Sequence, residues 1–263
     1  MELNRLFSRI YSTSASQFGL NPMRFIRAIS RIPQFLKEYN EFKKNYKGLL
    51  LLAPHLHERF DESGETKSEY FLQDLIIAKR IFNSSPKKHI DIGSRIDGFV
   101  AHVASFRELE VLDIRPITQL IPGIVFRQVD VMNLKSSIEI SSLACDSLSC
   151  LHTIEHFGLG RYGDPINVNG FVDGIRNIAS LLTPDGVLYL STPIGKERVE
   201  FNANRVFNPF DILREAEKHR LKLVKLTTIK NSEVLEHNIT REVLSDLADE
   251  WYSLGVFEFV KLR

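Results

Sequence analysis

The chain has 263 residues, 43% of them hydrophobic and 25% charged, so it is long and apolar enough to bury the core of a globular domain. Its formal net charge of +1 gives no overall electrostatic reason to expect a nucleic-acid partner. No signal-peptide pattern opens the sequence, and the apolar run from Leu49 to Pro54 is far too short to span a membrane, which predicts a cytoplasmic protein.

The sequence has two cysteines, Cys145 and Cys150. They lie five residues apart in one predicted strand, so we expect their side chains on opposite faces and unpaired. Unpaired cysteines suit a reducing compartment such as the cytosol.

Residues 1–50 are more basic than the rest, with nine Lys or Arg residues against three Asp or Glu residues. Apolar residues recur there at helical spacing with basic residues between them, which predicts a basic amphipathic helical extension; the apolar positions are Phe25, Ile29, Ile32, Leu36, Tyr39 and Phe42. Pro33 should kink or divide this helix. Three roles stay open: packing on the main domain, forming a homodimer, or peripheral contact with the inner face of a membrane.

A polar loop follows, in which His55 and His57 lie two residues apart. No third ligand is near in the sequence, so solvent-facing histidines are expected rather than a metal site. The next helix is predicted from Ser68 to Phe82, because Ser68 can cap it and the apolar residues at 71, 75, 78 and 82 share one face.

From residue 88 the chain alternates between strand and helix patterns. Strands are expected near 88–92, 109–114, 124–129, 146–151, 186–192, 221–229 and 254–261, and helices near 97–106, 115–121, 170–182, 209–219 and 239–251. The alternation predicts a Rossmann-like α/β domain over 51–263, with a mostly parallel sheet covered on both faces and a ligand at the carboxyl ends of the strands.

The stretch 88–100 has the pattern of a short buried strand, a turn containing Gly93, and a helix start. A dinucleotide site requires G-x-G-x-x-G, but the third position counted from Gly93 is an arginine. A site for S-adenosylmethionine needs a tight turn beside an acidic strand end, and a second carboxylate for the ribose. Asp91 and Gly93 supply the first pair, Asp113 could accept from both ribose hydroxyls, and Asp130 could accept from the adenine amino group.

Five ordered segments resemble the motifs of class I S-adenosylmethionine-dependent methyltransferases over about residues 86–263: Asp91-x-Gly93, Val111-Leu112-Asp113, Val129-Asp130-Val131, Leu151–His156 and Leu182–Pro193. The resemblance implies a seven-stranded sheet whose last strand is antiparallel, and S-adenosylmethionine as cofactor. It implies cofactor-binding positions at Asp91, Gly93, Ser94, Arg95, Asp113, Ile114, Asp130, Val131, Leu151 and His152.

Segments 92–99 and 156–165 are similar, more narrowly, to a little-characterised branch of this family that is often met among surface-polysaccharide genes. The chain departs from the usual family turn, which has glycines at the positions of Arg95 and Asp97. Arg95 could pair with the methionine carboxylate of the cofactor or with Asp97, and we favour the internal pair. A turn changed in this way could also have lost cofactor binding.

Methyl transfer is an in-line displacement in which alignment contributes most, but a hydroxyl acceptor must still lose its proton. His152 and His156 each suit the role of base near neutral pH, and Glu155 could orient one of them. In the wider family such a glutamate–histidine pair often packs structurally, which is the other interpretation. The glycine-rich loop 158–165 should lie where the acceptor binds, and Asp164 could bind its hydroxyls or a cation.

The sequence therefore predicts an S-adenosylmethionine-dependent O-methyltransferase that acts on a small-molecule or glycan acceptor, such as a sugar or polysaccharide precursor, without a metal site. One alternative is a catalytically silent protein of the same fold that binds or assembles partners in glycan synthesis. The changed glycine turn motivates this alternative. A nicotinamide oxidoreductase is the other alternative, and the arginine in the turn argues against it.

Overall fold

The computed structural model describes residues 21–263 apart from 57, 62, 65 and 137–139. The chain divides into two compact units, Met1–Glu65 and Thr66–Arg263. His57 lies outside the described residues, and His55 places its Nδ1 2.9 Å from Oε1 of Glu58. Among the described helices, none combines the length and the apolar content needed to cross a bilayer.

The first unit contains helix α2 (Pro22–Asn45), which begins at an Asn21 cap whose side chain accepts from the Arg24 amide. The helix continues through Pro33, so the prediction that proline divides it is wrong. One proline removes a single backbone hydrogen bond, and the long helical segments on each side make enough bonds to continue the helix. No residue of α2 is fully buried.

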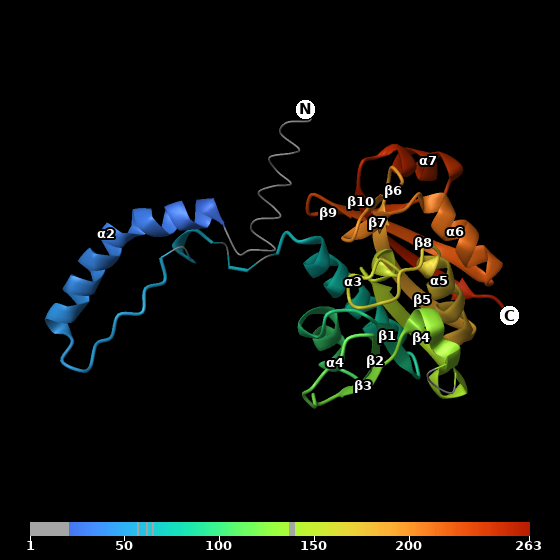
Figure 1. Ribbon diagram of the computed structural model, residues 1–263, viewed down its shortest axis with the longest axis horizontal. Helices are drawn as coiled ribbons and strands as arrows, with labels where there is room; N and C mark the ends of the chain where they lie inside the picture. Colours follow the sequence, from blue (N-terminus) through green and yellow to red (C-terminus); the bar gives the residue numbers. More distant parts are fainter. Residues whose placement is uncertain (1–20, 57, 62, 65, 137–139) are drawn as a thin grey trace. The chain divides into compact units, whose positions relative to one another are not determined.

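The second unit is built on an eight-stranded sheet in the order β3-β2-β1-β4-β5-β10-β8-β9 (Figure 1). The strands β1 to β5 are parallel, β10 is antiparallel to both β5 and β8, and β9 adds an antiparallel edge strand to β8. The bounds are β1 His89–Ile92, β2 Leu109–Asp113, β3 Ile124–Gln128, β4 Cys145–Leu151, β5 Leu182–Ile194, β8 Leu221–Lys230, β9 Glu233–His237 and β10 Ser253–Lys261.

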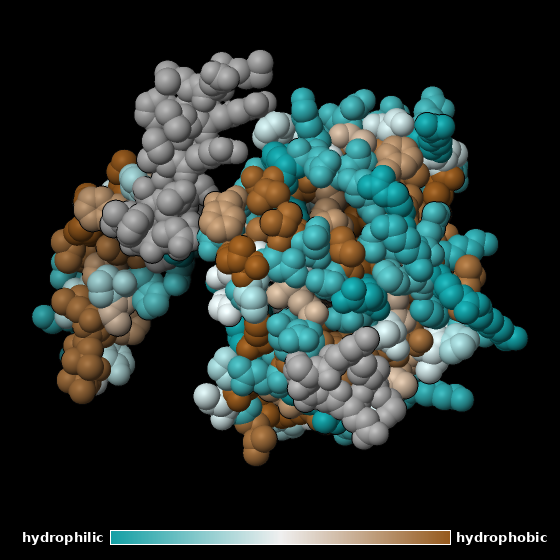
Figure 2. Space-filling model, turned by 45° about the vertical axis from the view of Figure 1, so that its right-hand side comes forward, coloured by the Kyte–Doolittle hydropathy of each residue, from teal (hydrophilic) through white to brown (hydrophobic). Residues whose placement is uncertain are grey.

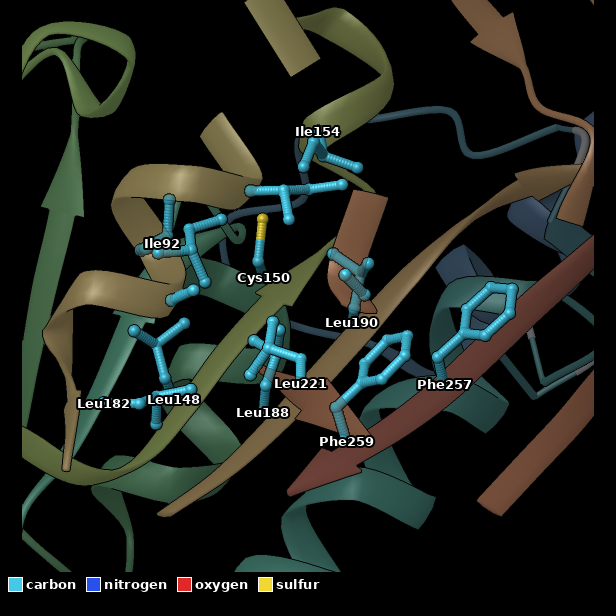
Figure 3. Close-up of a cluster of buried hydrophobic side chains, with 14 of the residues drawn as sticks. Ile92, Leu148, Cys150, Ile154, Leu182, Leu188, Leu190, Leu221, Phe257 and Phe259 are labelled. Atoms are coloured by element: carbon cyan, nitrogen blue, oxygen red, sulfur yellow. The ribbon is translucent and has the colours of Figure 1, made fainter. Parts of the chain in front are cut away.

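Helices cover both faces of this sheet. One apolar cluster contains residues of α3 (Glu69–Ser84) and α4 (Ala101–Ala104), and the other contains residues of α5 (Gly170–Leu181), α6 (Pro209–Lys218) and α7 (Arg241–Asp249). Figure 3 shows the second cluster, where Leu148 of β4, Leu190 of β5 and Phe257 of β10 project from neighbouring strands. The predicted Rossmann-like α/β architecture is therefore confirmed.

The structure differs from the predicted elements in several places. No helix forms over 115–121, because Pro116 and Pro122 interrupt it and Arg115 turns back to bind Asp113. The predicted helix 97–106 is a π-helical turn (Ile96–Val100) followed by the short α4. The edge strand β9 and a separate hairpin of β6 (Arg198–Glu200) and β7 (Asn204–Val206) have no predicted counterpart.

Helix α3 begins after the predicted Ser68 cap, whose hydroxyl accepts from the Phe71 amide. Its buried face was predicted correctly at Ala78 but wrongly at Leu75, which is 43% exposed, and at Phe82, which is 60% exposed. Besides Ala78, the helix buries Gln73, Asp74, Ile77 and Ile81. The buried face includes the polar residues Gln73 and Asp74 because this part of the helix borders a cavity, described below, rather than the apolar core.

Cys145 and Cys150 are both buried and unpaired, as expected. They nevertheless belong to the same apolar cluster, so the prediction of opposite faces is wrong. The pairing of β4 with β5 shifts register between Cys145 and Ser147. Such an irregularity inserts an extra residue into the alternation, which brings both thiols to one face.

The corrected α3 face leads to a stability prediction. Ile77→Ala removes a fully buried side chain and should lower the free energy of unfolding by about 2–5 kcal/mol. Leu75→Ala, on the exposed side of the same helix, should cost less than about 1 kcal/mol. Urea unfolding followed by circular dichroism measures both; equal losses would contradict this assignment of the two faces.

Candidate functional site

Two adjoining cavities open where the parallel strands β1, β2 and β4 end. The wider has a volume of about 670 Å³ and the narrower about 60 Å³. This is the edge of an open α/β sheet at which ligands bind. Both cavities are bordered by the same six residues, Gly93, Asp113, Arg115, His152, His156 and Tyr162.

Buried contacts stabilise the turn after β1. Gly93 has a φ of +70°, and a Cβ there would lie 2.3 Å from Cγ2 of Thr153, so only glycine fits. The fully buried carboxyl of Asp91 accepts from the Ser94 amide (3.1 Å), the Ser94 hydroxyl (2.8 Å) and the Ser149 hydroxyl (2.5 Å). Burial raises the pKa of Asp91 to about 7. Asp91 and Ser94 therefore organise the turn, and of the two only Ser94 borders a cavity.

The changed positions of the turn pair with each other. Arg95 donates from Nε and Nη2 to the two oxygens of Asp97, at 3.0 and 2.7 Å. Both side chains are at least 70% exposed, so the pair contributes little stability. Both residues border the wider cavity, and the favoured internal pairing is the arrangement present.

Asp113, at the end of β2, borders both cavities but already has a partner. Its Oδ1 accepts from the Arg115 amide (2.8 Å) and Nε (3.0 Å), and its Oδ2 accepts from Nη2 (2.6 Å). A carboxylate offers about four acceptor positions, so one remains for a ligand hydroxyl. The Arg115 guanidinium also lies 4.5 Å from the ring centre of Tyr162, which connects Asp113 to the loop 158–165.

The remaining predicted cofactor positions line the two cavities. Ile114, Asp130 and Val131 border the narrow one, and Leu151 borders the wide one. The Asp130 carboxylate accepts from the Met132 amide at 2.9 Å.

His152 follows β4 and borders both cavities, and one of its ring nitrogens has no described partner. Its Nδ1 lies 2.9 Å from Oε1 of buried Glu155, and its ring stacks on Tyr70 with 4.3 Å between centres. The side chain is only 7% exposed, and its Nε2 is buried without a hydrogen-bond partner. The residue has a φ of +48°, which costs about 1 kcal/mol for a non-glycine residue. A buried polar atom without a partner, in a strained loop at a cavity, indicates a place for a ligand.

His156 has a different environment. Its Nδ1 donates to the Ala203 carbonyl at 2.7 Å, and Arg161 donates to the same oxygen at 2.7 Å. Its Nε2 lies 3.9 Å from Oε1 of Glu155. Burial lowers the pKa of His156, so the ring stays neutral near pH 7.

Asp164 organises the glycine-rich loop from inside. Its carboxylate accepts from the amides of Gly158 (2.8 Å), Gly160 (3.1 Å) and Tyr162 (3.1 Å). These bonds hold Tyr162 with its ring near the Arg115 and Arg161 guanidinium groups. The described contacts of Asp164 are those of a loop anchor, and binding of an acceptor or cation there stays a prediction.

Arg205 of β7 binds several backbone carbonyls of the segment from Glu155 to Asn167. Its buried guanidinium donates to the carbonyl of Phe157 at 2.5 Å and to those of Glu155 and Asn167 at 3.4 Å. The β6–β7 hairpin therefore supports the histidine loop.

Three cavity residues on α3 were not predicted: Tyr70, Gln73 and Asp74. Gln73 donates to Asp74 at 3.0 Å, and burial raises the pKa of Asp74 and of Tyr70. The signal that could have found them is their spacing of three and four positions, which puts polar side chains on the buried face of a helix leading to β1.

Comparisons with known proteins address the fold. A family model described as "Caenorhabditis protein of unknown function, DUF268" matches residues 125–214. A comparison with curated proteins found no match.

Three solved structures illustrate the structural likeness. The 1,6-didemethyltoxoflavin-N1-methyltransferase of Burkholderia thailandensis, with bound S-adenosylhomocysteine, has a TM-score of 0.53 at 13% identity and covers 75% of this chain and 80% of its own. The N-methyltransferase NodS of Bradyrhizobium japonicum, in complex with S-adenosylhomocysteine, has a TM-score of 0.50 at 14% identity, with 80% and 94% covered. The [4+2]-cyclase SpnF has a TM-score of 0.51 at 12% identity, with 76% and 86% covered. The chain thus has the fold of class I S-adenosylmethionine-dependent methyltransferases, with β9 as an eighth strand.

The buried carboxyl of Asp91 leads to a pH prediction. An unfolded aspartic acid loses its proton near pH 4, whereas Asp91 keeps it up to about pH 7 in the folded protein. The folded state therefore binds more protons in this window, and its stability falls as the pH rises. Relative to Asp91→Asn, the wild type should lose roughly 2–4 kcal/mol between pH 4 and 7 in urea unfolding. A constant difference between the two proteins would show that Asp91 is already ionised.

Proposed function

We propose that the protein is an S-adenosylmethionine-dependent methyltransferase. The observation that carries this proposal is the convergence of the Gly93 turn, the Asp113 carboxylate and the His152 ring, whose Nε2 has no described partner, at two adjoining cavities. The wider cavity has a volume in the range of pockets that hold small-molecule ligands. The fold and the residues present both fit an adenosyl cofactor.

The cofactor would lie across both cavities. Asp113 would accept from a ribose hydroxyl through the acceptor position that Arg115 leaves open. The adenine would lie in the narrow cavity between apolar Ile114 and Val131, near the Asp130 carboxylate. Tyr162 and Arg115 border that cavity and would lie beside the ring.

When bound, S-adenosylmethionine supplies an electrophilic methyl group to an acceptor in line with its sulfur. For a hydroxyl acceptor, a new carbon–oxygen bond replaces the carbon–sulfur bond, and the hydroxyl proton goes to a base. His152 is the better candidate, since an Nδ1–H that donates to Glu155 leaves the lone pair of Nε2 without a partner on a ring that borders both cavities. His156 uses Nδ1 to hold the loop through Ala203.

The acceptor is proposed to be a sugar or a glycan precursor, methylated on oxygen. The wider cavity supports this, since it is bordered by polar groups that can bind hydroxyls, including Tyr70, Asp74 and Arg161. The narrower resemblance of segments 92–99 and 156–165 to a branch met among surface-polysaccharide genes points the same way.

A non-catalytic protein of this fold is the second candidate. Arg115 holds three of the acceptor positions on Asp113, one with its backbone amide and two with its guanidinium, which is the observation that favours it. SpnF, with a similar fold, is named a cyclase rather than a methyltransferase. Calorimetric titration with S-adenosylhomocysteine decides first whether the cofactor pocket functions, and absence of binding would reject the methyltransferase proposal.

Asp113→Ala should weaken S-adenosylhomocysteine binding by about 10- to 100-fold, because a hydrogen bond to a charged carboxylate is lost. The matched control is Asp185→Ala, which removes an exposed carboxylate that also pairs with an arginine and borders neither cavity. The control should change the affinity by less than about threefold. Equal effects in the two variants would show that Asp113 does not contact the cofactor.

His152→Ala should lower the rate of methyl transfer by roughly 100-fold or more while leaving S-adenosylhomocysteine affinity within a few-fold. Transfer of a radiolabelled methyl group to a panel of nucleotide sugars and glycan extracts measures the rate. His156→Ala is the comparison, and it should lower stability more than it lowers the rate of the folded fraction. Full activity in His152→Ala would remove this residue as the base.

A further inference from the structure

Helix α2 presents a wide apolar face to its surroundings. None of its residues is buried, and Phe25 is 67%, Ile29 50% and Leu36 47% exposed. Figure 2 shows brown, apolar side chains gathered on the visible surface of this helical unit. An exposed apolar face of this kind marks an interaction site.

Most apolar and basic residues of α2 lie on separate stripes, while Lys43, seven positions after Leu36, lies at the end of the apolar one. With about 100° between successive residues, Phe25, Ile29, Ile32 and Leu36 fall along one stripe of the helix. Basic residues seven positions apart follow both margins of this stripe: Arg24 with Arg31, and Lys37 with Lys44. Long cationic side chains at such margins can place their charge beside the apolar face while their methylenes cover its edge.

The segment after the helix is also both basic and apolar. Between Glu41 and Glu58 the sequence has three lysines and no Asp or Glu, together with four consecutive leucines at 49–52. Of these leucines, Leu49 is 83% and Leu51 74% exposed. Apolar and basic residues without acidic neighbours therefore extend well beyond α2.

We propose that α2 and the leucine segment 49–52 bind the surface of an anionic membrane, with the helix lying in the interface. A helix that is strongly amphipathic, rich in Lys and Arg, and not apolar enough to span the bilayer is typical of such binding. Charge favours this partner over a second copy of the chain. Paired apolar stripes of two copies would bring four basic margins together, whereas anionic lipids neutralise them.

This inference goes beyond the proposed function and does not depend on it, because membrane binding requires neither cofactor nor acceptor. The full-length protein is mixed with vesicles of equal parts phosphatidylglycerol and phosphatidylcholine, or of phosphatidylcholine alone, and sedimented. Binding to the anionic vesicles should exceed binding to neutral ones by at least about tenfold and weaken in high salt. Equal binding to both vesicles, or binding to neither, would overturn the proposal.

Two pairs of variants test the two stripes separately. Phe25→Ser with Leu36→Ser should reduce partitioning by at least about tenfold, since each removes apolar surface that enters the interface. Leu120→Ser with Leu235→Ser is the matched control, because it removes exposed apolar side chains outside α2 and should leave partitioning unchanged. If both pairs lose binding equally, α2 is not the binding element.

Arg24→Gln with Lys37→Gln should reduce binding to anionic vesicles by about 30-fold at low salt, which is the effect of two basic residues at such a surface. Lys79→Gln with Lys222→Gln makes the same change in net charge on exposed residues elsewhere and should have little effect. Sedimentation velocity without vesicles tests the alternative that a second copy of the chain covers the apolar face of α2. A dimer that Phe25→Ser with Leu36→Ser dissociates, in a protein that binds no vesicles, would show that a second copy covers this face.

Discussion

The close approach of Gly93 to Thr153 is the constraint on which the candidate site depends. A methyl group at Gly93 would meet Thr153 at 2.3 Å, so the turn after β1 lies directly against the loop after β4. The Asp91 carboxyl fixes this arrangement by binding Ser94 of the turn and Ser149 of β4. Because the two loops touch, Asp113 and His152 border the same cavities although 39 positions separate them in the sequence.

Much of this arrangement was predictable because its signals are local. The alternation of buried strands and amphipathic helices predicted the sheet, and Gly93 beside Asp91 predicted the turn. Ser68 predicted the start of α3 by its capping chemistry. Asp113 was predictable since parallel strands end at one edge of the sheet, where its carboxylate is found.

The features that were missed depend on contacts through space. The pattern of apolar residues in the sequence does not reveal that Arg115 turns back onto Asp113 and prevents a helix at 115–121. Tyr70 of α3 reaches the site because that helix packs beside the histidine loop, and only the fold puts its ring against His152. Likewise, the three amides bound by Asp164 are apparent only once the glycine loop is folded.

Tyr162 borders the narrow cavity, with the Arg115 guanidinium 4.5 Å from its ring centre and the ring centre of His156 at 5.5 Å in an edge-to-face arrangement. Exchange of any molecule in that cavity must separate these aromatic and cationic groups before diffusion can begin. Release of a nucleoside from that cavity would therefore require the loop 158–165 to move, and loop motions that gate binding sites fall on the microsecond-to-millisecond scale.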